Sequence, residues 1–388
     1  MKIKKGTLLQ IIIIIFTAIV TVIYYLYIND NISFKLLSIG DMNPYGGWSA
    51  LKSNFTDLSY RFRGFSKSMA LTISIFFTAL FMGRFFCGNI CPIGAMQDFF
   101  KYIGKKLKIK EIKLPKSRFF NLEWLKYFIL ILVMVLSIIK LGNVVSPFSP
   151  WLGYLNIFMG FSLQFSTIIL IIVILLSLFV KRVFCRCFCP LGAFQSLLYV
   201  VGPFKVYKTE SCNNCSHCLK NCPMDIQTED LIISPECISC SECMNSRCIK
   251  GNEGYSYKLF NKKIKNYTFK SILLLLSIYL IIPLISSSKE AMTMNKINNL
   301  QNGVYFGSGT GFGGKMEVEV FIDLNKIKDI KIISHEETSG YHQEVFKEIS
   351  KKIKETQNLN PDVISGATAS SRGFVNAVKD AVSKSLIN

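Results

Sequence analysis

Histidine is scarce in this chain, with only His217, His335 and His342 among 388 residues. None of the three lies in a long apolar run, so a haem held by two histidines inside a membrane is excluded. His217 stands between two cysteines, but we interpret it as a loop residue and not as a ligand. Any redox chemistry must therefore use other side chains.

Acidic residues are also few, 25 against 45 basic ones, which gives a formal charge of +20 in a chain that is 50% hydrophobic. Such a chain is too apolar for a nucleic-acid binder and too charged for membrane spans alone. We expect a membrane protein with soluble parts, in contact with lipid and with no nucleic-acid partner. A span needs about 20 apolar residues. Five spans are predicted, at Leu8–Ile28, Met69–Phe86, Phe119–Ile139, Thr167–Val180 and Ser271–Ser286.

Cysteine is absent after Lys250, and all 13 cysteines precede that residue. Lysine and arginine near span ends stay in the cytoplasm, so Lys2 and the basic stretch 101–118 place the N-terminus and the second loop there. This orientation leaves the cysteines on the reducing side and exports a cysteine-free segment that forms no stray disulfide. The first run has no small-residue cleavage site, so we interpret it as a retained span.

Eight of the cysteines form two runs. These are Cys212-x2-Cys215-x2-Cys218-x3-Cys222-Pro and Cys237-x2-Cys240-x2-Cys243-x4-Cys248. In such an arrangement three thiolates hold one cubane cluster and the fourth crosses to the other. We predict one [4Fe-4S] cluster on Cys212, Cys215, Cys218 and Cys248, and a second on Cys237, Cys240, Cys243 and Cys222. Paired zinc sites or a disulfide knot are the alternatives.

A short internal repeat precedes these runs. Residues 84–97 match residues 182–195 at an offset of 98, and each copy holds Cys-x3-Cys-Pro at a span end. Parallel repeats emerge at the same membrane depth, so Cys87, Cys91, Cys185 and Cys189 are predicted to share one further iron–sulfur centre. Buried cysteines or cytosolic disulfides are the alternative.

Two features of the repeat have other interpretations. Arg84 and Arg182 occupy equivalent positions, where a positive charge would stabilise a reduced cluster; we favour the ordinary role of snorkelling to the interface. Cys187 has no counterpart in the first copy and receives no role.

About 100 residues follow the fifth run, and they predict a small α+β domain. Lys315–Asp323 alternates as a half-buried strand, with 327–334 as its neighbour and helices at 341–354 and 373–386. Ser365-Gly366-Ala367-Thr368 stands just ahead of the last helix. Hydroxyls and amides at a helix start favour a phosphate site, although an ordinary helix cap uses the same residues.

The repeats and the two cysteine runs, over residues 83–250, resemble the NapH and NosR type of membrane polyferredoxin. This resemblance implies electron transfer at the membrane, commonly with quinone or a partner oxidoreductase.

The C-terminal stretch resembles FMN-binding domains of the RnfG and NqrC type. That resemblance implies FMN bound to Thr368 through a phosphoester, with Ser365, Gly366 and Ala367 completing the motif and a flavin transferase as partner. Two further segments, 307–314 and 336–341, match the same family, which implies that Glu337, Thr338 and Tyr341 lie near the flavin.

The predicted fold class is a multi-span α-helical membrane protein with an inserted bacterial-ferredoxin-like domain and a C-terminal α+β FMN-binding domain. The expected domains are a membrane domain with four spans, the cytoplasmic ferredoxin segment, the fifth span and an extracytoplasmic FMN-binding domain. Their bounds are 1–204, 205–265, 266–288 and 289–388.

The predicted function is transmembrane electron transfer between a cytoplasmic donor or acceptor and an extracytoplasmic redox partner. A membrane quinone oxidoreductase and a redox or maturation partner of an extracytoplasmic metalloenzyme are the alternatives.

Overall fold

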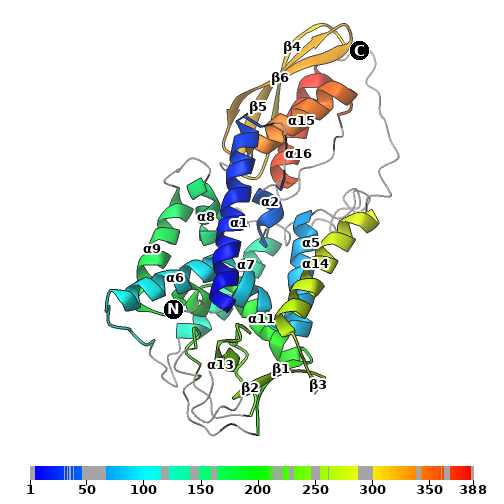
Figure 1. Cartoon of the computed structure of the whole chain (residues 1–388). Helices are drawn as coiled ribbons and strands as arrows, with labels where there is room; N and C mark the ends of the chain where they lie inside the picture. The colour runs from blue at the N-terminus through cyan, green and yellow to red at the C-terminus, as the bar shows by residue number, and fades with distance from the viewer. Residues whose placement is uncertain are drawn as a thin grey trace. The chain divides into compact units, whose positions relative to one another are not determined.

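A computed structural model describes most of the chain in two compact units (Figure 1). The first unit contains residues 1–19 and 73–278, and the second contains residues 20–72 and 279–388. The described residues are 5–29, 31–32, 34, 36–37, 39–45, 67–114, 122–139, 148–158, 164–210, 212, 218, 222–226, 231–245, 254–260, 262–286, 300–337, 342–359, 361 and 368–385.

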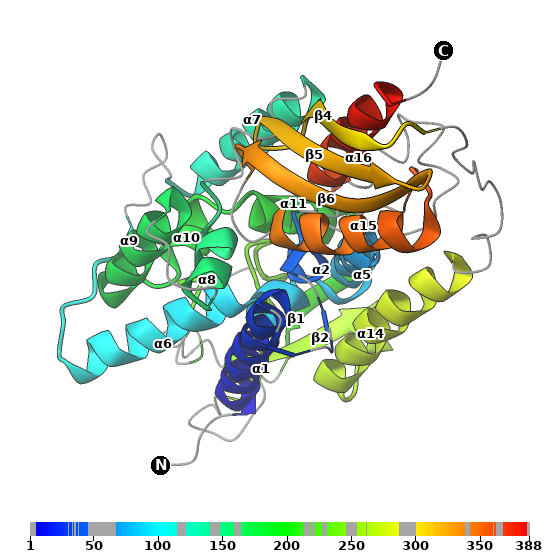
Figure 2. The same ribbon diagram turned by 90° about the horizontal axis from the view of Figure 1, so that it is seen from above.

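Helices make up most of the first unit. α6, Pro92–Lys106, packs against α9, Phe165–Phe179, and α9 in turn packs against α8, Pro150–Phe158 (Figure 2). α11, Pro190–Val201, packs against α7, Leu125–Ile138. The shorter elements are the π-helix Phe86–Ile90, the 3-10 turn Leu122–Trp124, α10 at Val183–Cys187 and α13 at Glu242–Asn245.

Three helices contribute one part to each unit. They are α1 at Lys5–Ile28, α5 at Lys67–Met82 and α14 at Tyr267–Ser286. α5 ends at Met82 because Gly83 adopts a φ of +64° and its missing side chain makes room for the Phe204 ring. The predicted second span, which continued to Phe86, is therefore too long at its C-terminal end.

Only one helix among the described residues is both long and apolar enough to cross a membrane, the stretch Leu8–Tyr27 of α1. Shorter apolar helices lie at Lys67–Met82, Phe165–Phe179, Pro190–Val201 and Tyr267–Ile282. The prediction of a mostly helical fold holds, whereas the count of five spans stays a prediction.

The ferredoxin segment, residues 205–265, is closed at its base by a small sheet. β1, Phe204–Lys208, pairs antiparallel with β2, Tyr255–Leu259, and β2 pairs with β3, Lys262–Lys263. The strand that enters the cysteine runs thus lies beside the strand that leaves them. This pairing holds together the two ends of the segment that contains the cysteine runs.

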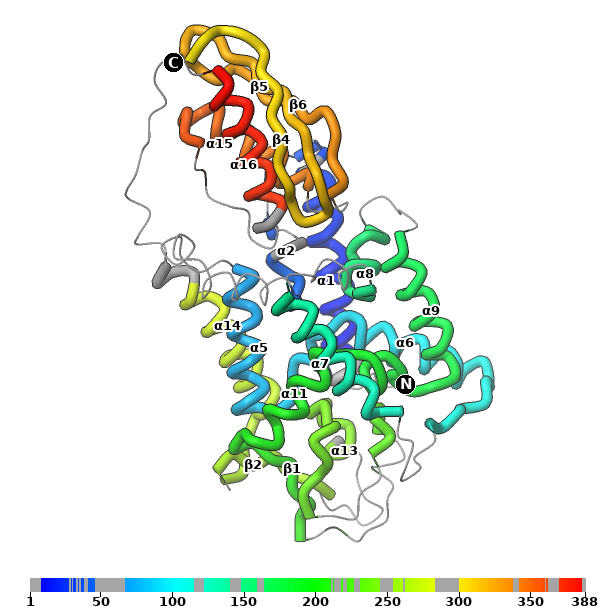
Figure 3. Tube along the Cα trace, turned by 180° about the vertical axis from the view of Figure 1, so that it is seen from behind, coloured from blue at the N-terminus to red at the C-terminus, as the bar shows by residue number. Residues whose placement is uncertain are grey.

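The second unit contains an antiparallel sheet in the order β4-β5-β6. Its strands are Gly303–Thr310, Lys315–Asp323 and Lys326–His335. Both α15, His342–Thr356, and α16, Thr368–Ser383, pack on one face of this sheet (Figure 3). The strand and helices predicted from periodicity are confirmed, but α16 begins five residues earlier than predicted and β4 was not predicted as a strand.

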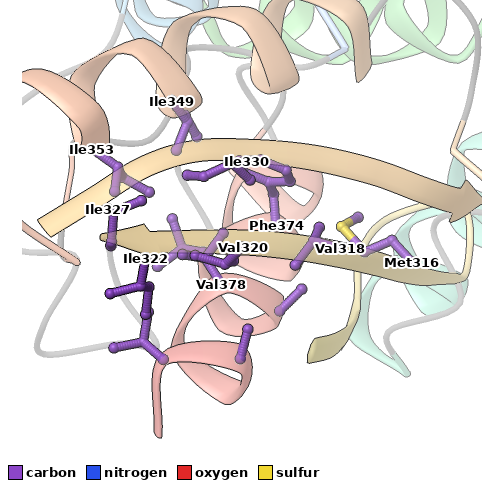
Figure 4. Close-up of a cluster of buried hydrophobic side chains, with 14 of the residues drawn as sticks. Met316, Val318, Val320, Ile322, Ile327, Ile330, Ile349, Ile353, Phe374 and Val378 are labelled. Carbon is purple, nitrogen blue, oxygen red and sulfur yellow. The ribbon is translucent and has the colours of Figure 1, made fainter. Parts of the chain in front are cut away.

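The core of this domain follows from the alternation along β5. Successive residues of a strand face opposite sides, so Met316, Val318, Val320 and Ile322 all point toward the helices (Figure 4). Phe374 of α16 fills the space between them and is fully buried. Gly309 lets the helix backbone approach β4, because a Cβ there would lie 2.2 Å from the carbonyl oxygen of Gly373.

Candidate functional site

The two repeats bring their paired cysteines to the first turns of α6 and α11. Cys91 and Cys189 are the residues just before these helices, and a proline follows each at the first helical position. Cys87 lies in the π-helix and Cys185 in α10, one short turn earlier in each copy. We call Cys87, Cys91, Cys185 and Cys189 the cysteine quartet.

Each repeat reaches across to the cysteine of the other. The Cys87 thiol donates to Oε1 of Gln195 at 3.2 Å, and Nε2 of Gln97 donates to the sulfur of Cys185 at the same distance. Gln97 and Gln195 are equivalent positions in the two copies. The two repeats therefore lie side by side, linked by two reciprocal hydrogen bonds. The two glutamines are site residues that the sequence analysis did not single out.

Burial and mutual repulsion dominate the electrostatics of the quartet. Burial raises the pKa of Cys91 well above its ordinary value, and the nearby Cys185 and Cys87 raise it further. Burial likewise raises the pKa of Cys87 to about 11, with Arg84 acting in the opposite direction. Thiols that disfavour ionisation together need a positive partner, which bound iron would provide.

No group of three or more metal-binding side chains with the spacing of a single ion occurs among the described residues. A cluster has one thiolate per iron, so its ligand sulfurs stand farther apart than those around one ion. The quartet fits such a group because buried donors remain unused beside it: Nε and Nη2 of Arg84 and Nε2 of Gln195 have no oxygen or nitrogen acceptor in the described structure.

The expected snorkelling of the two arginines is wrong. Arg84 is 0% exposed and Arg182 is 1% exposed. Arg84 pairs with Glu236 at 2.9 Å and Arg182 pairs with Asp98 at 2.5 Å. Both charges are drawn inward by these carboxylates, so they lie beside the cysteines and not at a lipid interface.

The second cysteine run lines a small pocket. Four of the residues that line it are Cys222, Cys237, Cys240 and Cys243, and most of the others are apolar, such as Ile238 and Tyr257. Cys222 belongs to the first run in sequence but lies with the second run in space. The structure thus brings together the four residues predicted for one cluster, in a space with the required thiol donors.

Two of the four residues predicted for the other cluster are described. Cys212 and Cys218 both lie close enough to Tyr255 to influence its ionisation: burial first, and then these thiolates, raise its pKa to about 12. Cys215 and Cys248 lie outside the described residues, as does His217. Cys187 is fully buried near the charges of Arg186 and Glu123.

The ferredoxin segment contacts the first repeat directly. Gly88 lies so close to it that a Cβ would stand 2.1 Å from the carbonyl oxygen of Ile238, and Nδ2 of Asn89 donates to the carbonyl oxygen of Ser239 at 3.3 Å. Ile238 and Ser239 lie between Cys237 and Cys240. We call this contact, together with the Arg84–Glu236 ion pair, the junction.

Charge reinforces the junction. The Glu236 carboxylate accepts from Arg84, Lys126 and Tyr127, and Lys126 and Tyr127 come from α7. Burial alone would raise the pKa of Glu236, but the charges of Arg84 and Lys126 hold it at about 2. The carboxylate is therefore ionised at neutral pH and fixes the second cysteine run against the helices.

The flavin motif lies partly outside the described residues. Thr368 is the first residue of α16, whereas Ser365, Gly366, Ala367, Thr338 and Tyr341 are not described. Glu337 is described and 7% exposed. Its Oε2 accepts from Ser370 at 2.6 Å and from the backbone of Gly313 at 3.2 Å.

Glu337 thereby joins the glycine-rich loop to the first turn of α16, two residues beyond Thr368. Its other oxygen, Oε1, is buried and has no hydrogen-bond partner in the described structure. A free acceptor beside a helix N-terminus suits a ligand that offers both N–H and phosphate groups, as FMN does.

Comparison with known proteins matches both parts of the chain. A 4Fe-4S binding domain model matches residues 68–110 and 163–209, which contain the two repeats. An FMN-binding domain model matches residues 311–383.

Three relatives illustrate the first match. Uncharacterized protein MJ0750 of Methanocaldococcus jannaschii is 35% identical over 192 residues, 49% of this chain and 79% of that protein. The putative electron transport protein YccM of Escherichia coli is 29% identical over 188 residues, 46% of this chain and 53% of that protein. The regulatory protein NosR of Pseudomonas aeruginosa is 30% identical over 197 residues, 47% of this chain and 27% of that protein.

These features define an electron-transport protein with 4Fe-4S and FMN-binding domains. The chain belongs to the NosR and NapH type of polyferredoxin and is fused to an FMN-binding domain. Both resemblances stated from the sequence are confirmed.

Proposed function

We propose that this protein conducts electrons across a membrane, between iron–sulfur centres on the cytoplasmic side and FMN on the outer side. The observation that carries the proposal is the junction, where the backbone between Cys237 and Cys240 touches the repeat that contains Cys87. Close approach of the residues beside Cys87 and Cys237 favours electron exchange between the cofactors that the two cysteine groups would hold. The cofactors supply the redox chemistry, and the protein fixes their order and surroundings.

The proposed ligands are the three cysteine groups. Cys222, Cys237, Cys240 and Cys243 would hold one [4Fe-4S] cluster at the pocket, and the quartet would hold a further centre between the repeats. The first ferredoxin cluster would use Cys212 and Cys218 together with Cys215 and Cys248. Thiolate sets of four suit iron–sulfur clusters and leave no open position for substrate.

The proposal includes several spans, although among the described residues α1 alone has the full length. Large apolar side chains remain exposed along α7, α9 and α14, among them Phe128 at 64%, Ile172 at 49% and Leu273 at 57%. Leaving one such side chain in water forgoes roughly 1.5–3 kcal/mol. Lipid would cover these surfaces at no such cost, which supports a multi-span arrangement.

The proposed flavin carrier is Thr368, to which a flavin transferase would attach FMN through a phosphoester. Thr368 begins α16, and the helix N-terminus favours the negative phosphate. Glu337 would accept a hydrogen bond from the flavin through its unused Oε1. Ser365, Gly366, Ala367 and Thr338 complete the proposed site by resemblance.

Opposite sides of the membrane are supported by the distribution of charge and cysteine along the sequence. The basic stretch 101–118 favours the cytoplasm, and the segment after Lys250, which has no cysteine, can be exported without forming a stray disulfide.

Cofactor content and labelling of intact cells test this function. Purified protein should contain iron, labile sulfide and flavin that stays bound after denaturation. A cysteine in place of Ser287 should react with an impermeant maleimide, and one in place of Lys108 should not. Labelling at position 108 alone would place flavin and clusters on one side and would refute transmembrane transfer.

A further inference from the structure

The arginine of the first repeat has hydrogen-bonding capacity that no oxygen or nitrogen atom of the described structure uses. Arg84 is 0% exposed, and its Nη1 donates to Ser196 at 2.8 Å and to Glu236 at 2.9 Å. Its Nε and Nη2 groups have no oxygen or nitrogen acceptor. Buried donors normally find partners, because an unpaired one destabilises the fold.

We propose that Arg84 is a positioning residue that donates to sulfur of the quartet centre and raises its reduction potential. The proposal rests on the proposed function, because it requires a centre at the quartet. It assigns to Arg84 a role that Arg182, its equivalent in the other repeat, does not have.

The geometry points Arg84 at the quartet. Its Nη2 would lie 2.9 Å from a Cβ built on Gly192, and the backbone of Gly192 itself donates to the sulfur of Cys189 at 3.3 Å. The guanidinium also lies near enough to Cys87 to oppose the rise of its pKa. The free N–H groups are thus beside one cysteine from each repeat.

Arg182 provides an internal comparison. Its Nε and Nη2 donate to the two carboxylate oxygens of Asp98, at 2.9 and 2.5 Å. Its Nη1 donates to the carbonyl oxygen of Cys87 at 2.8 Å. Both arginines are buried, but each guanidinium nitrogen of Arg182 donates to an oxygen, whereas two nitrogens of Arg84 have no oxygen or nitrogen acceptor.

The sign of the effect follows from charge. Accepting an electron makes the centre more negative, so hydrogen bonds and positive charge beside it favour the reduced form and raise the potential. Arg84 and Lys126 together face the single carboxylate of Glu236, which leaves this side of the quartet net positive. No proton has to move for the effect to operate.

The test is a matched pair of variants in the intact purified protein, R84K and R182K. Both keep the charge and remove the planar fork of donors. The midpoint potential of each iron–sulfur signal is measured by electron paramagnetic resonance during a redox titration. We expect R84K to disfavour the reduced quartet centre about tenfold, or about 59 mV for one electron, and R182K to leave its potential unchanged.

A second variant should shift the potential of the quartet centre in the opposite direction. E236Q removes the negative charge and keeps a hydrogen-bonding side chain, so it should raise the potential of the quartet centre. It tests the proposal independently if R84K protein does not load its cofactors.

The results distinguish the role of Arg84 from the presence of a centre at the quartet. Equal shifts in R84K and R182K, or no shift in R84K or E236Q, would overturn the role of Arg84 and leave electron transfer standing. Absence of any third iron–sulfur signal in the unaltered protein would overturn the proposed centre and this role together.

Discussion

Substitution of Gly88 by alanine is the most direct perturbation of the junction. The new Cβ would stand 2.1 Å from the carbonyl oxygen of Ile238, whereas ordinary contact begins near 3.4 Å. Because the opposing atom belongs to the backbone, no side chain can rotate away. The two backbones must separate by more than 1 Å, and overpacking of this kind typically costs about 1–3 kcal/mol.

Gly88→Ala should therefore slow electron exchange between the second cysteine run and the quartet, while both sites still hold their clusters. Freeze-quenched samples, reduced from the ferredoxin side, would report by electron paramagnetic resonance how fast the quartet centre is reduced. Gly88→Ala should slow this step markedly. Asn89→Ala removes a single hydrogen bond across the junction, to Ser239, worth roughly 1 kcal/mol, and should slow the step less.

Gly254→Ala is the matched control in the ferredoxin segment. Its nearest neighbour would be the sulfur of Cys218 at 3.7 Å, which is ordinary contact. We expect it to exchange electrons at the unaltered rate. Full iron content and an unchanged rate in Gly88→Ala would refute the junction as the route.

Three further predictions concern the proposed cofactor sites and the domain that carries the flavin. Cys91→Ser and Cys189→Ser should each remove the same spectroscopic signal and leave the ferredoxin signals; loss of two different signals would show that the repeats do not share a centre. Thr368→Ala should abolish flavin fluorescence on a denaturing gel, at a stability cost of roughly 1 kcal/mol if the residue also caps the helix; fluorescence retained in the variant would exclude Thr368 as the attachment point. Phe374→Ala should destabilise the FMN-binding domain by about 3–5 kcal/mol, measured by chemical unfolding followed through flavin fluorescence; an unchanged unfolding midpoint would contradict the assignment of this core.

Spacing along the chain was enough to predict that Cys222 lies with the cysteines of the second run. The two runs and the repeat have local patterns, and the structure brings Cys222 to the second run as the pattern requires. Alternation in β5 predicted the core of the C-terminal domain because a strand's two faces are readable from sequence. β4 was missed because its glycines, including Gly309, obscure that alternation.

Long-range contacts could not be predicted in this way. Arg84 at a span end suggested snorkelling, and its burial depends on Glu236, 152 residues later. The hydrogen bond from Gln97 to Cys185 depends on how the two repeats pack together, and neither repeat's sequence alone predicts it. The second predicted span was also too long at its C-terminal end, because a hydropathy pattern does not register the left-handed backbone at Gly83.

Flavin reduction in vesicle-embedded protein tests transmembrane transfer most directly. An impermeant low-potential reductant is added on the ferredoxin side, and the absorbance of FMN enclosed on the other side is followed. We expect bleaching of the flavin in the unaltered protein and none in Cys189→Ser, whose ferredoxin clusters should remain reducible. Bleaching at the same rate in Cys189→Ser, or only when the reductant is on the flavin side, would contradict transmembrane transfer through the quartet.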